Sequence, residues 1–198
     1  MVVRVSAVLR IPWGKFPVPF ELTFDHIVAF AVLTVFPLCV IYATFSDLLS
    51  MKISNLTCGV LVLGFFILAP LSGMGWQAIA IHSSVAVAAL VMGMSFFSMG
   101  VMGGGDAKLI AAVSLWLGLG LTLPYILAAS LLGAVVTLVI VGLRKAKPRL
   151  PQAFRDWRVM AKVLDRKEGI PYGLALGPAA LVVFTISPWV TSAARASL

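Results

Sequence analysis

The sequence predicts an all-α membrane protein, a polytopic bundle of about six transmembrane helices. The first observation is composition: 61% of the 198 residues are hydrophobic and only 11% are charged. Soluble domains are about 45–50% apolar and about 25% charged. The second observation is that the charged residues leave long charge-free runs. These two features together exclude a disordered chain and a water-soluble globular domain.

Four runs without Asp, Glu, Lys or Arg define the elements: residues 26–46, 53–105, 109–143 and 169–194. Because about 20 apolar residues span a bilayer, the first and last runs hold one helix each. The second run holds two helices, with a break at residues 69–75. The third also holds two, with a break between Gly118 and Pro124, where glycine and proline interrupt a helix. The predicted spans are residues 27–47, 55–70, 76–98, 106–119, 122–143 and 171–190.

The predicted domain organisation is simple. Residues 1–25 contain three basic residues and three prolines but no compact apolar core ending at a small-residue cleavage site. We interpret them as an irregular N-terminal extension rather than a secretory signal. Residues 26–194 form a single membrane-embedded domain with a basic loop at 144–168, and residues 195–198 form a short tail.

The basic loop at 144–168 predicts the orientation. It carries nine Lys or Arg residues against three acidic ones, and loops rich in Lys and Arg lie on the cytoplasmic side. Within the loop, Phe154, Trp157, Ala161 and Leu164 recur at helical spacing. This pattern predicts an amphipathic helix on an anionic lipid surface. The lipid bilayer therefore accounts for the positive charge, and nucleic-acid binding is not expected.

Asp47 and Asp106 are the acidic residues that adjoin the membrane-spanning body. Counting crossings back from the basic loop places both at the cytoplasmic face. An acidic group at membrane depth costs about 2.5–3.5 kcal/mol and indicates function. The 15 residues from Asp106 to Gly120 form about 22 Å of helix, so Asp106 is expected below the membrane surface. The alternatives are that Asp47 pairs with Lys52 at a helix end and that Asp106 is an N-cap.

Two carboxyl groups held together in a low-dielectric site share one proton. One carboxylate deprotonates a water while the protonated partner donates a hydrogen bond to the substrate carbonyl, as in aspartic proteases. This chemistry needs no metal and no cofactor. Cys39 and Cys58 form no CxxC pair, so we interpret them as small buried hydrophobic residues rather than as a zinc site or a disulfide.

Three glycines, Gly103, Gly104 and Gly105, precede Asp106 directly. Consecutive glycines disfavour a helix and permit close backbone approach. Irregular backbone at membrane depth is tolerated only where protein or a water-filled cavity covers it. We therefore expect a non-helical segment that pairs with an extended peptide. The alternative is a hinge or a site of tight helix packing.

Three motifs resemble those of bacterial type IV prepilin peptidases. Residues 102–109, Met-Gly-Gly-Gly-Asp-Ala-Lys-Leu, resemble their second catalytic motif and contain the GxGD signature of intramembrane aspartic proteases. Residues 46–55 are similar to the first motif, with Ser54 where proline is usual. Residues 170–173, Ile-Pro-Tyr-Gly, are similar to the motif that opens the last span. The resemblance covers about residues 26–190.

This resemblance implies an aspartic endopeptidase of the bacterial inner membrane with Asp47 and Asp106 as the catalytic pair. Its partners would be prepilins, whose basic cytoplasmic leader is removed next to an apolar helix, together with the pilus assembly machinery. The large members of the family carry a cytoplasmic domain between the first two spans, often with CxxC pairs, and also N-methylate the product. Here only residues 52–55 occupy that place. The chain therefore resembles the short branch that serves Flp-type (tight-adherence) pili, and N-methyltransferase activity is not expected.

Lys108 and Asn55 are further candidates for substrate binding. The alternative for Lys108 is a lysine at the membrane interface whose charged end reaches water. The alternative for Asn55 is the N-terminal cap of the second span. His82 is predicted to be a packing residue. Two other classes of function stay open: an ion- or proton-coupled transporter or channel, and a non-catalytic component of a pilus or secretion system. The first requires acidic groups at several depths, yet the second, third and fifth spans contain no Asp or Glu.

Overall fold

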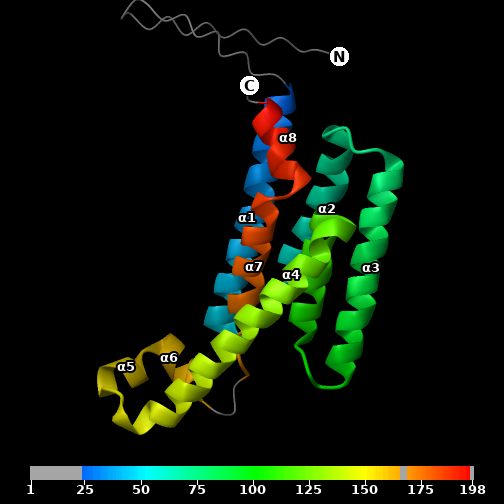
Figure 1. Ribbon diagram of the computed structural model, residues 1–198. Helices are drawn as coiled ribbons and strands as arrows, with labels where there is room; N and C mark the ends of the chain where they lie inside the picture. Colours follow the sequence, from blue (N-terminus) through cyan, green and yellow to red (C-terminus); the bar gives the residue numbers. More distant parts are fainter. Residues whose placement is uncertain (1–23, 166–168, 197–198) are drawn as a thin grey trace, which may run out of the picture.

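The computed structural model describes residues 24–165 and 169–196, and every regular element in that part of the chain is helical. Residues 1–23 of the predicted extension and the last two residues of the tail lie outside the described part. The all-α prediction is confirmed (Figure 1). The elements are α1 (Phe24–Ser50), α2 (Asn55–Leu71), α3 (Trp76–Ser98), α4 (Gly104–Ala146), the 3-10 helix η1 (Lys147–Arg149), α5 (Gln152–Asp156), α6 (Arg158–Val163), α7 (Gly173–Thr185) and α8 (Pro188–Ala196).

The helices have the length and composition of a multi-pass membrane protein. In the described part, α1, α3 and the stretch from α4 through η1 are long and apolar enough to cross a bilayer, while α2 and α7 are shorter apolar helices. Large apolar side chains such as Phe30 and Leu127 are exposed. A water-soluble protein rarely exposes so large an apolar surface, whereas lipid accepts it.

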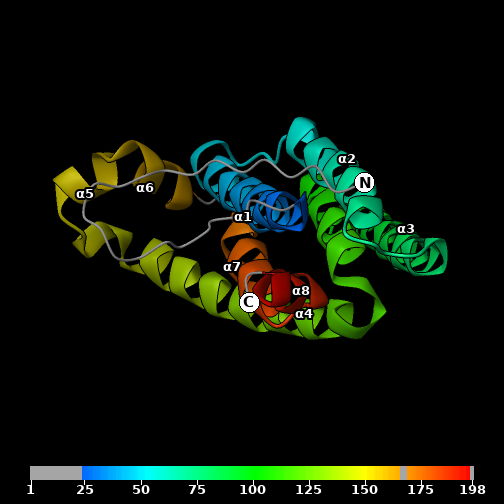
Figure 2. The ribbon, with the colours of Figure 1, turned by 90° about the horizontal axis from the view of Figure 1, so that it is seen from above.

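Helix α4 consists of two arms that meet at Gly118, within the break predicted between residues 118 and 124. Gly118 has φ 66° and ψ −170°, a backbone conformation that interrupts the helix and that glycine adopts without strain. The chain rises along the first arm and descends along the second (Figure 1), and seen from above the second arm runs outward to the segment with α5 and α6 (Figure 2). The two arms correspond to the predicted spans 106–119 and 122–143.

Side chains bind the carbonyl groups next to this interruption. His82 Nδ1 lies 2.8 Å from the carbonyl oxygen of Leu115, and the indole Nε1 of Trp189 donates to the carbonyl of Trp116 at 2.7 Å. Inside a bilayer a broken helix is tolerated where neighbouring groups bind the freed backbone. His82 therefore packs against the bend, in agreement with the role predicted for it.

Two predicted helices are wrong in detail. The single span at 171–190 is divided into α7 and α8, because the helix ends at Thr185 and Pro188 begins a new one, the position where proline is favoured. The single amphipathic helix in the basic loop is instead the short pair α5 and α6, separated by Trp157 in an extended conformation. Residues 166–168 of that loop lie outside the described residues.

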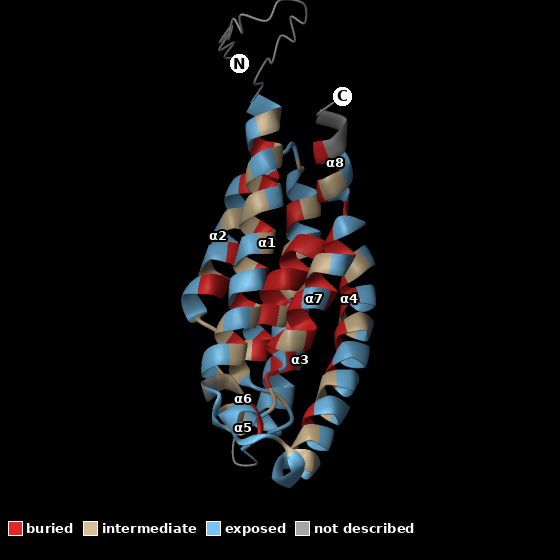
Figure 3. Ribbon diagram, turned by 90° about the vertical axis from the view of Figure 1, so that its left-hand side faces the viewer, coloured by how far each residue is buried: buried red, intermediate tan, exposed pale blue. Residues whose placement is uncertain are grey.

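The connections of the bundle are divided between its two ends. The links from α1 to α2 and from α3 to α4, and the segment with α5 and α6, lie together at the lower end of Figure 1, while α8 lies at the upper end beside the start of α1. Buried residues form a band through the middle of the bundle, and exposed residues cover its outside (Figure 3). The last turn of α1 and the first turn of α4 therefore share one end.

Candidate active site

Asp47 lies in the last turn of α1 and is 6% exposed. Its Oδ2 accepts a hydrogen bond of 2.7 Å from the backbone N–H of Gly173, at the start of α7. A Cβ atom on Gly173 would lie 2.7 Å from the Cβ of Asp47, and Gly177 one turn later packs against Thr44. Small residues four apart let two membrane helices approach closely. The two glycines thus let α7 pack closely against α1, with the N-terminus of α7 at the carboxyl group of Asp47.

Asp106 lies in the first turn of α4 and is 8% exposed. Gly103, not Asp106, is the N-cap residue of this helix, so the interpretation of Asp106 as a cap is wrong. Next to Asp106, Ala107 packs on α3, where a Cβ on Gly93 would lie 2.8 Å from the Ala107 Cβ. This close contact between α3 and α4 determines the position of the Asp106 backbone.

The glycine segment is helical over a larger part than predicted. Because α4 begins at Gly104, the predicted irregular backbone through Gly105 is wrong, and only Gly103 is extended. A Cβ on Gly103 would lie 2.8 Å from Asp106 Oδ2, and one on Gly105 would lie 3.2 Å from the Ile53 Cβ. Gly103 therefore makes room for the carboxyl group, and Gly105 makes room for the link between α1 and α2.

Hydrogen bonds hold that link in place. The hydroxyl of Ser46 donates to the carbonyl of Lys52 at 2.9 Å, and the hydroxyl of Ser50 donates to the carbonyl of Ser46 at 2.6 Å. Ser54 is the N-cap of α2 and accepts from the backbone N–H of Leu56 at 3.2 Å. The residue in the usual proline position therefore supplies the helix cap.

Asn55 and Lys108 are brought together by the fold. Asn55 is the first residue of α2 rather than its cap, so the capping alternative for Asn55 is wrong. The Nζ of Lys108 donates to Asn55 Oδ1 at 3.0 Å. This bond connects the segment that follows Asp47 with the helix that carries Asp106.

The carboxyl groups of Asp47 and Asp106 interact electrostatically, so the fold unites two residues from distant positions in the chain. Both are buried at one end of the bundle. Two buried carboxyl groups within electrostatic range are suited to hold one proton between them. In the described part of the chain no group of three or more His, Cys, Asp or Glu residues is placed to hold a metal ion.

A cavity of about 590 Å³ adjoins Asp106. It lies between the two arms of α4, with contributions from the end of α3 and the start of α7. Its walls are mainly apolar, and the polar side chains that line it include Asp106, Tyr125, Ser130, Thr137 and Tyr172. An apolar cavity with a few polar groups is typical of a binding site.

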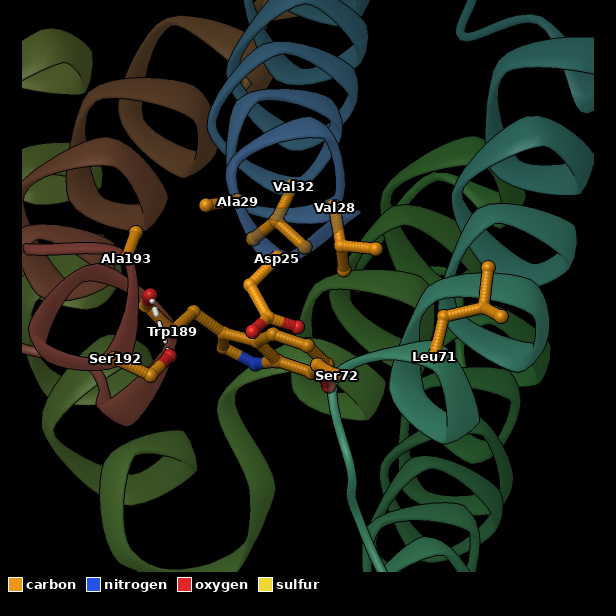
Figure 4. A pocket seen from close by; sticks show the side chains of 9 residues that line it. All are labelled: Asp25, Val28, Ala29, Val32, Leu71, Ser72, Trp189, Ser192 and Ala193. Atoms are coloured by element: carbon orange, nitrogen blue, oxygen red, sulfur yellow. Dashed lines mark hydrogen bonds between the residues drawn. The ribbon is translucent and has the colours of Figure 1, made fainter. Parts of the chain in front are cut away.

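A second, smaller cavity of about 320 Å³ lies at the opposite end of the bundle, among the start of α1, the end of α2 and α8 (Figure 4). The carboxyl group of Asp25 and the indole of Trp189 border it, and Ser192 donates to the Trp189 carbonyl at 3.0 Å. This cavity is remote from Asp47 and Asp106.

Gly173 and Tyr125 were not identified as site residues from the sequence. Gly173 had a signal, because it ends the motif at 170–173, but the pattern does not show that its N–H binds Asp47. Tyr125 had none, because a single tyrosine within an apolar run looks like any core residue.

Comparison with known proteins adds independent findings. Residues 34–138, more than half of the chain, match the family model described as the type IV leader peptidase family. A prepilin leader peptidase/N-methyltransferase of Pectobacterium carotovorum subsp. carotovorum is 44% identical over 62 residues, which are 31% of this chain and 22% of that relative. The match thus spans less than a quarter of the relative's length. No solved structure matches the chain.

Proposed function

The chain belongs to the type IV leader peptidase family, and on that premise we propose that it is a membrane aspartic endopeptidase that removes the leader peptide from type IV prepilins. Asp47 and Asp106 are the proposed catalytic pair. The observation that carries the proposal is their arrangement: two buried carboxyl groups from α1 and α4 interact at one end of the bundle, beside an apolar cavity that Asp106 lines.

The proposed reaction is general acid–base catalysis by the pair. One carboxylate removes a proton from a water molecule, which attacks the carbonyl carbon of the scissile peptide bond. The protonated partner donates a hydrogen bond to the carbonyl oxygen and stabilises the charge that develops on it. A proton then passes to the nitrogen, the C–N bond breaks, and the products are a carboxyl group on the leader and a free amine on the pilin. In this proposal the two aspartates move every proton, and the mechanism uses no cofactor.

The cavity beside Asp106 suits the apolar part of a prepilin. Its walls come from both arms of α4 and from the start of α7, and an apolar helix next to the cleavage site would bury its side chains there. Gly103 is extended and exposed, so we propose that its backbone contacts the substrate. Gly104 and Gly105 are proposed to permit the close packing around it, and Asn55 and Lys108 to hold the two catalytic segments in register.

We propose further that the chain serves Flp-type pili in the bacterial inner membrane, with the site at the cytoplasmic face. Residues 51–54 alone connect α1 with α2, where the large members of the family carry a domain. For this reason the proposal is limited to the peptidase reaction and does not include N-methylation. The orientation rests on the basic residues of the loop at 144–168. Its described elements η1, α5 and α6 lie at the same end of the bundle as the last turn of α1 and the first turn of α4.

Co-expression of the full chain with an Flp prepilin tests the proposal. The expected result is removal of the leader, read as a faster-migrating pilin on a gel, with no removal by Asp47→Asn. A prepilin of another type IV pilus, expressed in parallel, tests whether the enzyme prefers Flp prepilins. An uncut Flp prepilin together with a correctly inserted enzyme would contradict the proposed substrate. Cleavage of both prepilins to the same extent would contradict the Flp preference alone.

A further inference from the structure

Tyr125 combines deep burial with an unused hydroxyl group. It lies in the second arm of α4 and is fully buried. Its hydroxyl has no hydrogen-bond partner among the residues that the structure describes. Buried polar groups are nearly always paired, and an exception calls for a specific explanation. Phenylalanine would fill the same space without leaving a donor unpaired.

The surroundings of Tyr125 supply that explanation. Tyr125 and Asp106 line the same cavity, and the Asp106 carboxyl group lies within electrostatic range of the Tyr125 side chain. The other titratable groups near the pair are Asp47, which interacts with Asp106, and Tyr172 on the same cavity. The ammonium group of Lys108 donates a hydrogen bond to Asn55 Oδ1. Asp106 is therefore the acceptor best placed for the phenolic O–H.

We propose that Tyr125 is a positioning residue for Asp106, whose hydroxyl donates a hydrogen bond to the Asp106 carboxylate when substrate occupies the cavity. Hydrogen bonds at catalytic groups are often long in the free enzyme and tighten in the complex. The bond would orient Asp106 and stabilise the singly ionised state of the aspartate pair. This inference rests on the proposed function, because it assigns a role within the same site.

The bond has a predictable effect on the dependence of the reaction on pH. A donor to the ionised form of a carboxyl group favours that form. Without the donor, the pair takes up a proton at higher pH, and the pair titrates as a unit. The acidic limb of the pH–rate profile should then move to higher pH.

The test compares purified wild type with Tyr125→Phe in cleavage of a synthetic prepilin peptide. We expect kcat to fall about tenfold while KM stays nearly unchanged, because Asp106 is then no longer oriented for proton transfer in the transition state. We expect the acidic limb to move up by about one pH unit. The thermal midpoint of Tyr125→Phe should equal or exceed that of wild type, because the variant removes a buried, unpaired hydroxyl. Tyr42→Phe is the matched control, since Tyr42 is an exposed residue of α1.

Each other outcome has a definite meaning. A wild-type kcat and pH profile in Tyr125→Phe would overturn the inference. A lower thermal midpoint with an unchanged profile would also overturn it, because the hydroxyl would then serve the fold alone. The aspartate variants test the proposed function separately: if Asp106→Asn still cuts, the proposed function fails whatever Tyr125→Phe does. If the aspartate variants are inactive and Tyr125→Phe behaves as wild type, only the inference about Tyr125 fails.

Discussion

The backbone N–H of Gly173 donates a hydrogen bond of 2.7 Å to the carboxylate of Asp47, 126 residues earlier in the chain. The bond joins the end of α1 to the start of α7. The acceptor is the Oδ2 atom of Asp47. Gly173 therefore both orients Asp47 and, by lacking a side chain, makes room for it.

The first prediction concerns the aspartate pair. Asp47→Asn and Asp106→Asn should each abolish prepilin cleavage, because an amide has nearly the shape of a carboxyl group but cannot relay a proton. Both variants should insert and accumulate as wild type does. Leader removal on a gel, with the amount of enzyme measured by immunoblot, checks this. Near-normal processing by either variant would refute the assignment of that aspartate.

The second prediction concerns Gly173. In Gly173→Ala the new methyl group would lie 2.7 Å from the Asp47 Cβ and 2.8 Å from its Oδ2, so α7 must shift away and the hydrogen bond must lengthen. We expect a loss of activity of about 100-fold, as when a catalytic group is displaced by roughly 1 Å. Gly142→Ala is the control, because nothing lies within 4 Å of that position. Equal cleavage rates in the two variants would contradict the role of Gly173.

The third prediction concerns the bond between Lys108 and Asn55. If the pair holds the catalytic segments in register, Lys108→Met and Asn55→Ala should each lower kcat/KM by roughly three- to tenfold, with no further loss in the double variant. The measurement is a double-mutant cycle in the peptide cleavage assay. Losses that multiply in the double variant would show that each residue contacts the substrate independently.

The fourth prediction concerns the bend in α4. A Cβ on Gly118 would lie 2.5 Å from His82 Nε2, and the residue has positive φ. Gly118→Ala should therefore lower the thermal midpoint clearly, whereas Gly120→Ala, with nothing within 4 Å, should not. His82→Ala should lower the free energy of unfolding by about 1–3 kcal/mol, because the Leu115 carbonyl loses its hydrogen-bond partner. Thermal unfolding in detergent measures all three, and equal midpoints for the two glycine variants would argue against the packed bend.

The fifth prediction concerns orientation. In a chain with Cys39 and Cys58 replaced by alanine, a cysteine at Lys145 should react only with reagents that reach the cytoplasm. A cysteine at Gly75, in the link between α2 and α3 at the other end of the bundle, should react from outside. Labelling of intact cells at Lys145 by an impermeant reagent would invert the orientation and place both aspartates on the wrong side for a cytoplasmic leader.

Much of the fold could be predicted, because a membrane-spanning helix is decided by local composition. The charge-free runs correspond to α1, α2, α3 and the two arms of α4, and the break near Gly118 follows from glycine and proline in a short segment. The errors fall where local signals are weak. The end of α7 at Thr185 is marked in the sequence only by Pro188, and a single proline in an apolar run is also tolerated inside a membrane helix. The spacing around Trp157 suggested one helix where the chain forms two.

The position of the two aspartates at one end of the bundle followed from counting crossings, since hydropathy and charge act locally and each crossing reverses the chain. Their surroundings did not follow from the pattern. The bond from Gly173 to Asp47, the bond from Lys108 to Asn55 and the burial of Tyr125 beside Asp106 join residues on different helices or on opposite arms of α4. Such contacts depend on how closely the helices approach and how they are rotated, and these are set by side-chain packing across the whole bundle.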